Sequence, residues 1–278
     1  MSVWFTEDQV PGLRLSCRVS RVLHQEKTPF QHLAILETEV FGRVLTLDGI
    51  IQTTEHDEFI YHELIAHVAM CAHRGTLRRV LIIGGGDGGT MRQVLRHRQV
   101  TACHLVEIDE RVVAVAREFL PALSAAMDDP RAKVIIADGI EYVRDVQEAY
   151  DLIIVDSTDP IGPAVGLFSA DFYAGAHRAL AVDGMCVAQT ESAFHNARLV
   201  PAIFARMAGN FPIARLYLGA IPSYPGGPWS FTVGSKLYDP AEPVRPPPGD
   251  LRYYSPDVHR AAFALPPYVV QALAHPPS

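Results

Sequence analysis

Acidic residues follow a series of short apolar runs, at positions where carboxylates could bind a cationic ligand. The first run leads into a glycine-rich loop, Gly84–Gly89, which carries Asp87. The later runs end at Glu107, Asp138-Gly139, Asp156 and Gln189. For a single acid, the alternative is a helix cap or a solvated loop carboxylate. Four acids after four consecutive runs instead predict one acidic site.

The spacing of these residues indicates the class of ligand. The glycine loop allows a ligand to approach the backbone closely. Glu107 stands about 20 positions after the loop, where an acid commonly binds the ribose hydroxyls of an adenosine-type ligand. Asp138 could accept a hydrogen bond from an adenine amino group. Because Asp87 would repel a pyrophosphate and attract a sulfonium or ammonium, a cationic adenosine ligand fits better than NAD.

A second acidic segment, Asp156–Pro163, carries two carboxylates in a loop that two prolines make rigid. This arrangement suits a substrate with ammonium groups. Asp156 or Asp159 could take a proton from an attacking amine while the other holds a charged amine. The alternative for Asp159 is a cap on the next helix.

Aromatic residues could line the same site. Tyr224 lies in a proline- and aromatic-rich loop and could hold the methylene chain or ammonium of a polyamine; simple loop packing is its alternative. Tyr61 and His62 are adjacent on a predicted helix, so we expect that they do not both reach one spot. A buried structural role is predicted for one of them, and His62 could equally be a surface histidine.

The elements that position these residues predict an α/β fold. Residues 1–53 contain short β-rich runs with an Asp48-Gly49 hairpin signal, and Thr54 could cap the helix that follows. From residue 79, strands alternate with helices, which predicts a doubly wound parallel sheet. Strands are predicted at Val80–Ile83, His104–Val106, Val134–Ile136, Leu152–Val155 and Met185–Ala188, and helices at Thr90–His97 and Arg111–Phe119. We expect two domains, 1–53 and 54–278, with the ligand outside the carboxyl ends of the strands.

Composition excludes several classes of protein. The 278 residues carry a formal net charge of −7 with no basic cluster, so we expect no nucleic-acid partner. No apolar run approaches the roughly 20 residues of a membrane helix, and the first residues do not resemble a signal peptide. We therefore expect a cytoplasmic protein. Its four cysteines are predicted to be buried reduced thiols rather than ligands of a structural zinc ion.

Taken together, the motifs resemble those of the spermidine synthase family. They are Asp48–Gln52, Asp57–Glu63 (DEFIYHE), Gly84–Gly89, Asp156–Pro163, Ser223–Trp229 and Arg252–Pro266. The resemblance spans nearly the whole chain. It implies a small antiparallel β domain before a Rossmann-like domain of the methyltransferase type, in a homodimer or homotetramer. It further implies transfer of an aminopropyl group from decarboxylated S-adenosylmethionine to a diamine, usually putrescine, giving spermidine and 5'-methylthioadenosine with neither metal nor further cofactor.

The resemblance also assigns roles to residues. Asp156 matches the proton acceptor, and Asp87 the acid that holds the aminopropyl ammonium. For the aminopropyl donor, Gln31 matches a contacting glutamine and Glu107 matches the acid that binds the ribose. Asp138 and Gly139 match the adenine contacts, and Pro163 lies in the gate loop near the nucleoside. Positions around the polyamine channel match Tyr61, His62, Asp159, Gln189 and Tyr224. The segment Thr190–His195 does not match a family motif, and it lies where the family varies for acceptor choice.

Three rival functions share some of these features. A putrescine N-methyltransferase would use S-adenosylmethionine, but the acids around Asp87 disfavour its carboxylate. A catalytically silent nucleoside- or polyamine-binding protein would not need both Asp156 and Asp159. A nicotinamide dehydrogenase would need a basic residue beside the glycine loop. The sequence leaves open the acceptor among putrescine, cadaverine, agmatine and spermidine, as well as dimer against tetramer and regulation.

Overall fold

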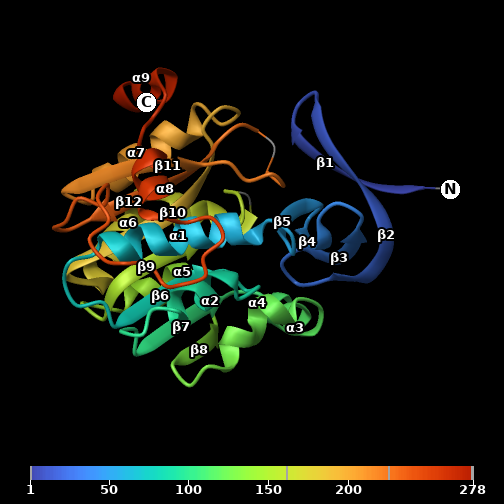
Figure 1. The fold of residues 1–278 in the computed structure, drawn as a ribbon, viewed down its shortest axis with the longest axis horizontal. Helices are drawn as coiled ribbons and strands as arrows, with labels where there is room; N and C mark the ends of the chain where they lie inside the picture. Colours follow the sequence, from blue (N-terminus) through green and yellow to red (C-terminus); the bar gives the residue numbers. More distant parts are fainter. Residues whose placement is uncertain (1, 161, 225, 277–278) are drawn as a thin grey trace.

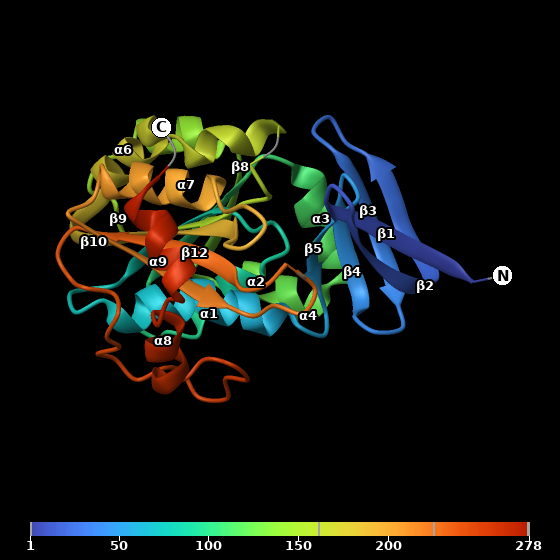
Figure 2. The same ribbon diagram turned by 90° about the horizontal axis from the view of Figure 1, so that it is seen from above.

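The computed structural model describes residues 2–160, 162–224 and 226–276, which form two sheets and their helices. Figure 1 shows the smaller, N-terminal sheet in blue beside a larger body, and Figure 2 shows helices on both faces of the larger sheet. An antiparallel β unit thus precedes an α/β doubly wound unit, which confirms the predicted fold class.

The first sheet is antiparallel throughout, with its strands in chain order. The strands are β1 (Val3–Val10), β2 (Leu13–Lys27), β3 (His32–Thr38), β4 (Gly42–Leu47) and β5 (Ile50–Thr54). The predicted Asp48-Gly49 hairpin joins β4 to β5, where Leu47 pairs with Ile50. Both turn residues have positive φ, 50° and 78°, as a two-residue turn matching the strand twist requires.

The second sheet is mixed and has the order β11-β12-β10-β9-β6-β7-β8. Its strands are β6 (Arg79–Gly84), β7 (Ala102–Glu107), β8 (Ala132–Ile136), β9 (Tyr150–Asp156), β10 (Leu180–Ser192), β11 (Ile213–Gly219) and β12 (Trp229–Ser235). The five predicted strands pair in parallel. The last two strands, which the sequence reading did not predict, extend the sheet in antiparallel fashion beside β10.

Helices cover both faces of this sheet, and its strands bury alternate residues on each side. One face packs against α1 (Glu58–Ala72), α2 (Gly89–Leu95) and α8 (Pro256–Ala262). The other packs against α5 (Gly139–Arg144), η2 (Gly162–Phe168), α6 (Ala170–Ala179) and α7 (Leu199–Ala208). Beside the outer strand β11, α9 (Pro267–Ala274) packs on α7.

The two sheets meet through an apolar contact. Leucines and isoleucine of β3 and β4 pack against α3 (Glu110–Phe119) and α4 (Pro121–Ser124), which η1 (Ala125–Asp128) follows. At the same contact Arg111 pairs with Glu26 at 3.0 Å, and the Arg43 guanidinium donates to the Phe119 carbonyl at 2.6 Å. The carboxyl ends of the parallel strands therefore face the first sheet.

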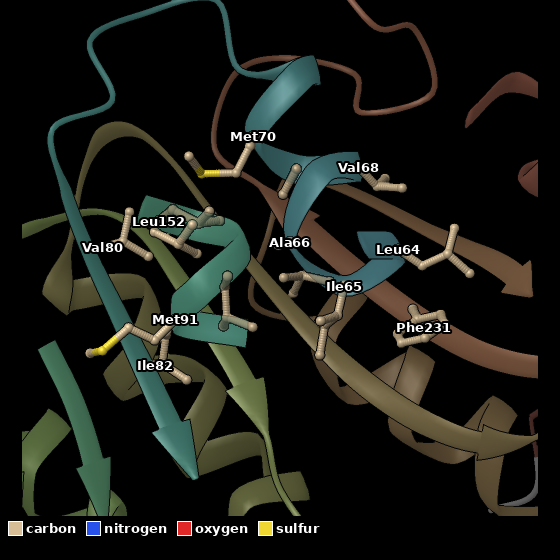
Figure 3. Packing of buried hydrophobic residues seen from close by; sticks show 14 of the residues in the cluster. Leu64, Ile65, Ala66, Val68, Met70, Val80, Ile82, Met91, Leu152 and Phe231 are labelled. Atoms are coloured by element: carbon tan, nitrogen blue, oxygen red, sulfur yellow. The ribbon is translucent and has the colours of Figure 1, made fainter. Parts of the chain in front are cut away.

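Helix α1 lies at the centre of the larger core. Figure 3 shows Ile65 directed toward the neighbouring helix α2 and the sheet, and Leu64 directed toward Phe231. Nearly every residue of α1 is buried, which is typical of a helix covered on all sides. Its outer side is covered by the C-terminal segment, since the Cys71 carbonyl accepts from the backbone of Val244.

Some predicted boundaries were wrong. Thr54 does not cap α1 but ends β5; the N-cap is Asp57, which accepts a hydrogen bond from the Thr54 hydroxyl at 2.6 Å. Strand β10 extends past Gln189 to Ser192. All four cysteines are free and buried, as expected. Among the described helices, none has both the length and the apolar character needed to cross a membrane.

Buried Glu63 on α1 holds the C-terminal segment. Its carboxylate accepts backbone N–H groups of Arg252 at 3.0 Å and of Tyr253 and Tyr254 at 2.8 Å each. Tyr254 in turn packs in the core against α1. One side chain thereby satisfies three backbone donors that would otherwise be buried without partners.

We expect Glu63→Ala to lower the free energy of unfolding by about 3 kcal/mol, because it leaves buried donors without acceptors. Urea unfolding at one fixed protein concentration measures this loss. The matched control is Glu141→Ala, which removes an exposed ion pair with Arg144 and is expected to have little effect. Equal unfolding midpoints for the two variants would contradict the role of Glu63.

Candidate active site

A cavity lies at the carboxyl ends of β6, β7 and β9, where the larger sheet faces the first one. Both sheets contribute to its wall: Phe30, Leu45 and Leu47 lie on the N-terminal side, and Ile83 and Val106 on the other. The predicted site residues that line this first cavity are Gln31, Tyr61, His62, Asp87, Glu107, Asp138, Gly139, Asp156 and Tyr224. The structure thus brings together residues that are widely separated in the sequence.

The glycine loop forms the floor of the first cavity and runs against the acids. Gly84 and Gly85 have positive φ, 79° and 65°. A Cβ on Gly84 would clash with the backbone carbonyl of Asp156, and one on Gly85 would lie 2.7 Å from the Asp156 carboxylate. On Gly86 it would lie 2.9 Å from Glu107. Glycine is therefore required for the loop to pass beside both carboxylates.

Two hydroxyl groups hold the Asp156 carboxylate. Tyr61 donates to Oδ1 at 2.7 Å, and Thr90 donates to Oδ2 at 2.6 Å. Burial raises the pKa of Asp156, and nearby Asp87 adds to this effect, while His62 and the two hydroxyls oppose it. A buried carboxylate with an elevated pKa and no bidentate cation partner is suited to accept a proton.

An ionic chain lies beneath Asp87. His62 Nδ1 is 2.6 Å from Glu58 and Nε2 is 3.5 Å from Asp87, while Arg92 donates to both Glu58 oxygens at 2.6 and 2.7 Å. Burial alone would lower the pKa of His62, but the two carboxylates raise it to about 10. Burial would likewise raise the pKa of Glu58, but His62 and Arg92 lower it to about 2. His62 is therefore an imidazolium at neutral pH.

Tyr61 and His62 reach different spots of one cavity, as expected of adjacent residues on a helix. Both line the first cavity, because it extends along the end of α1. Tyr61 reaches Asp156, whereas His62 lies under the glycine loop and reaches Asp87. His62 is only 2% exposed, so it is not a surface histidine.

Two acids lie at the other end of the first cavity. Glu107 accepts the backbone N–H of Asp109 at 3.0 Å, and burial raises its pKa to about 7. Asp138 accepts from the Ile140 N–H at 2.8 Å and so caps α5, although it also lines the cavity. Its capping role and a ligand-binding role are therefore compatible.

A second cavity adjoins the first and shares its walls at Gln52, Tyr61, Ser157 and Tyr224. It contains Asp159 and Gln189, together with Glu7 from β1 and Glu191 from β10. The Tyr224 hydroxyl donates to the Gln52 carbonyl, so this ring is fixed between the two cavities. The Gln189 amide donates to the Ser157 carbonyl at 3.1 Å and holds the loop after β9.

The second cavity collects carboxyl groups whose pKa values are raised. Burial and the neighbouring Asp159 raise the pKa of Glu191 to about 9, and burial also raises that of Asp159. Burial raises the pKa of Glu7 to about 7 despite a hydrogen bond from the Ile51 N–H. A cationic ligand would relieve the repulsion within this group.

A bulge in β10 directs Glu191 into the second cavity. The pairing with β12 shifts register between Gln189 and Ser192, and Glu191 has a φ of 76°. Bulges that redirect side chains are common beside active sites. This irregularity lies within Thr190–His195, the segment that matched no family motif, and Ser192 and His195 also line the second cavity.

The sequence reading missed several residues of these cavities. Glu191 had no local signal, because the bulge between Gln189 and Ser192 interrupts the regular alternation of the strand. Thr90 and Arg92, which hold residues of the site without lining a cavity, had none, because their contacts with Asp156 and Glu58 join separate elements. Glu58 had one, since it stands four positions before His62 on one helix. Pro163 lies in η2, and its side chain is outside the described residues. Across residues 2–160, 162–224 and 226–276, no group of three or more His, Cys, Asp or Glu is arranged to hold a metal ion.

Comparisons with known proteins give one consistent result. The model of the spermine/spermidine synthase domain matches residues 58–242, and that of the spermidine synthase tetramerisation domain matches residues 3–55. The polyamine aminopropyltransferase of Moorella thermoacetica is 54% identical, covering 99% of this chain and 97% of that protein. That of Bacillus mycoides is 46% identical, covering 97% and 98%.

Solved structures agree with this result. A spermidine synthase in complex with the transition-state analogue AdoDATO superposes with a TM-score of 0.95 at 42% identity, covering 98% of this chain and 95% of that one. The spermidine synthase of Thermotoga maritima gives 0.92 at 40% identity, covering 98% and 94%.

The charge on His62 can be tested directly. Since the pKa of His62 in the folded protein is about 10 and the ordinary value is 6.5, the stabilising effect of its charge is complete below pH 6.5 and is lost as pH rises through 10. We expect ¹⁵N NMR of labelled histidines to show a charged His62 ring from pH 6 to 9. In the same spectra buried His67, whose pKa burial and His97 lower to about 3, is expected to stay neutral. In Glu58→Gln, His62 is expected to lose its charge at a lower pH; an unchanged titration would contradict this account.

Proposed function

This chain belongs to the spermine/spermidine synthase family and is a polyamine aminopropyltransferase, and we propose that its two cavities hold the two substrates. The first takes decarboxylated S-adenosylmethionine and the second takes putrescine, giving spermidine and 5'-methylthioadenosine. The observation that carries this proposal is the place of Asp156, which Tyr61 and Thr90 hold beside the shared wall of the cavities.

The first cavity fits the chemistry of the donor. Glu107 and Gln31 line the part of the cavity that we assign to the ribose, and Asp138 and Gly139 line the part that we assign to the adenine. Asp87 faces the sulfonium and the aminopropyl ammonium. Pro163 belongs to the segment after Asp156 that we propose closes over the nucleoside.

The second cavity fits a diamine. Burial raises the pKa of both Asp159 and Glu191, so this pair retains a proton in the absence of substrate, and an ammonium can replace that proton. The rings of Tyr61 and Tyr224 contact each other edge to face, with centroids 6.0 Å apart, and form an aromatic wall on which the methylene chain can pack. Gln189 fixes the loop that carries Asp159, which keeps this acid in position.

Transfer then requires that one proton leaves the acceptor and that a nitrogen–carbon bond replaces a carbon–sulfur bond. The reactive ammonium of the acceptor loses a proton to Asp156, and its lone pair attacks the aminopropyl carbon next to sulfur. As the nitrogen–carbon bond forms, the carbon–sulfur bond breaks and its electrons stay on sulfur, leaving a neutral thioether. Positioning of the reactants supplies up to about 7–11 kcal/mol, and proton removal adds roughly 10²–10⁴-fold.

We further propose that residues 1–53 and 54–278 form separate domains and that the first joins copies of the chain into a homodimer or homotetramer. The tetramerisation-domain match to residues 3–55 supports this assembly, as do Val3 and Trp4 of β1, which are exposed. We place the enzyme in the cytoplasm, where its free thiols would stay reduced, with no cofactor and no nucleic acid.

A mass-spectrometric assay tests the function. We expect purified protein with decarboxylated S-adenosylmethionine and an equimolar mixture of putrescine, cadaverine, agmatine and spermidine to yield 5'-methylthioadenosine and mainly aminopropylated putrescine. A parallel reaction receives S-adenosylmethionine. A methylated amine there, without product in the first reaction, would instead establish the N-methyltransferase; no product in either would favour a silent binding protein.

The role of Asp156 is tested by Asp156→Asn, which keeps the shape of the side chain but cannot accept the proton. We expect turnover to fall by at least about 100-fold, while the affinity for 5'-methylthioadenosine measured by calorimetry changes little. A folded variant with near-normal turnover would remove Asp156 as the base. A parallel loss of nucleoside binding would assign it a structural role instead.

A further inference from the structure

Asp109 has a buried carboxylate that lies between the two sheets. The proposed reaction assigns no role to it. It is 1% exposed and caps α3 by accepting the Arg111 N–H at 3.0 Å. Its Oδ2 accepts two donors from the N-terminal side, the Thr28 hydroxyl at 2.7 Å and the Gln31 side-chain amide at 2.9 Å. Asp109 does not line either cavity, but Gln31 lines the first.

This contact fixes which end of the Gln31 amide faces the ligand. A glutamine amide carries a donor NH₂ and an acceptor oxygen on the same carbon, so binding one end sets the direction of the other. Since a carboxylate only accepts, Asp109 must take the NH₂ of Gln31. The Gln31 oxygen is then left to act as an acceptor at the cavity wall.

The same residue also orders Glu107. The backbone N–H of Asp109 donates to Glu107 Oε1 at 3.0 Å. Thr28 fixes the other side of the contact, because its hydroxyl oxygen accepts the backbone N–H of Gln31 at 3.0 Å while the hydroxyl donates to Asp109. One buried residue thereby sets two acceptors in place, Gln31 through its carboxylate and Glu107 through its backbone N–H.

We propose that Asp109 is a positioning residue that makes the donor site selective for ribonucleosides. Vicinal ribose hydroxyls are two donors, and the site that Asp109 arranges offers them two acceptors. A nucleoside lacking one hydroxyl leaves an acceptor unpaired, which costs affinity. This inference rests on the proposed binding of the donor nucleoside in the first cavity.

Asp109→Asn is the informative substitution. Asparagine caps helices as well as aspartate does, so its oxygen can keep the Arg111 contact. Its NH₂ would then face Thr28 and Gln31, and the Gln31 amide would have to rotate to offer its oxygen to that NH₂. The cavity would receive a donor in place of an acceptor.

Calorimetry with 5'-methylthioadenosine and its 2'-deoxy and 3'-deoxy analogues tests this inference. We expect Asp109→Asn to weaken binding of the ribonucleoside about three- to tenfold and to weaken binding of at least one deoxy analogue much less. The ratio of the two affinities, which measures the preference for the ribonucleoside, then becomes smaller. The KM for the donor is expected to rise with kcat nearly unchanged, because the Asp156 contacts are intact. Equal weakening of all three nucleosides, or of none, would overturn the proposal.

A second substitution provides a rescue. In Asp109→Asn/Gln31→Glu, a carboxylate at position 31 can accept from the asparagine NH₂ with one oxygen and face the ribose with the other. We expect the ribonucleoside preference to return in this double variant. If Asp109→Asn does not fold, Asp109→Ser keeps a capping hydroxyl but releases Gln31, and the same loss of preference is expected.

The matched control is Asp151→Asn. Asp151 is also a buried carboxylate, and it accepts the backbone N–H groups of Arg78 and Arg79 at 2.7 and 2.8 Å, at the opposite ends of β6 and β9 from the cavity. We expect it to leave the nucleoside preference unchanged. A wild-type chain that binds no 5'-methylthioadenosine would refute the proposed function itself, whereas normal binding and transfer with no change in preference would refute only the role of Asp109.

Discussion

Burying several carboxylates in adjoining cavities is costly, because each charged group loses its hydration. The surrounding structure offsets this cost in three ways. His62 and Arg92 neutralise the group beneath the glycine loop, and Tyr61 and Thr90 donate hydrogen bonds to Asp156. Where burial and a neighbouring acid outweigh the hydrogen bonds received, as at Glu191, the carboxyl group keeps a proton to a higher pH. A cationic substrate supplies the positive charge that these acids still lack. The affinity of the site for cations is therefore a consequence of its buried carboxylates.

Helix α1 connects this balance to the fold. Its acids at Asp57, Glu58 and Glu63 each bind a different part of the chain, so the helix cannot shift without breaking all three contacts. Asp57 accepts the Ser223 N–H at 2.7 Å and thereby anchors the loop of Tyr224. Glu58 binds Arg92 of α2, and Glu63 binds the C-terminal segment. The DEFIYHE motif therefore combines two residues of the cavity with three that fix the helix.

Sequence reasoning succeeded where a local rule determines the structure. Apolar strands ending in acids predicted which carboxylates meet, because parallel strands bring their carboxyl ends to one edge, and Asp48-Gly49 predicted its hairpin. It failed where partners come from distant elements. The contact between Thr90 and Asp156 depends on how closely α2 approaches β9, and the role of Asp109 depends on the packing of the two sheets. No periodicity in the chain encodes either distance.

The proposed chemistry also explains why the acids are divided between the cavities. Before transfer, the sulfonium and the aminopropyl ammonium both belong to the donor, and Asp87 attracts that molecule. After transfer, the thioether is neutral and the ammonium belongs to spermidine. In the proposed reaction, the nucleoside would then keep only its hydrogen bonds to Glu107 and its neighbours, whereas the polyamine would interact with Asp87, which lines the first cavity, as well as with Asp159, which lines the second. Transfer thus moves the aminopropyl ammonium from the donor to the polyamine. The electrostatic field of the site retains the donor before the reaction and the polyamine after it.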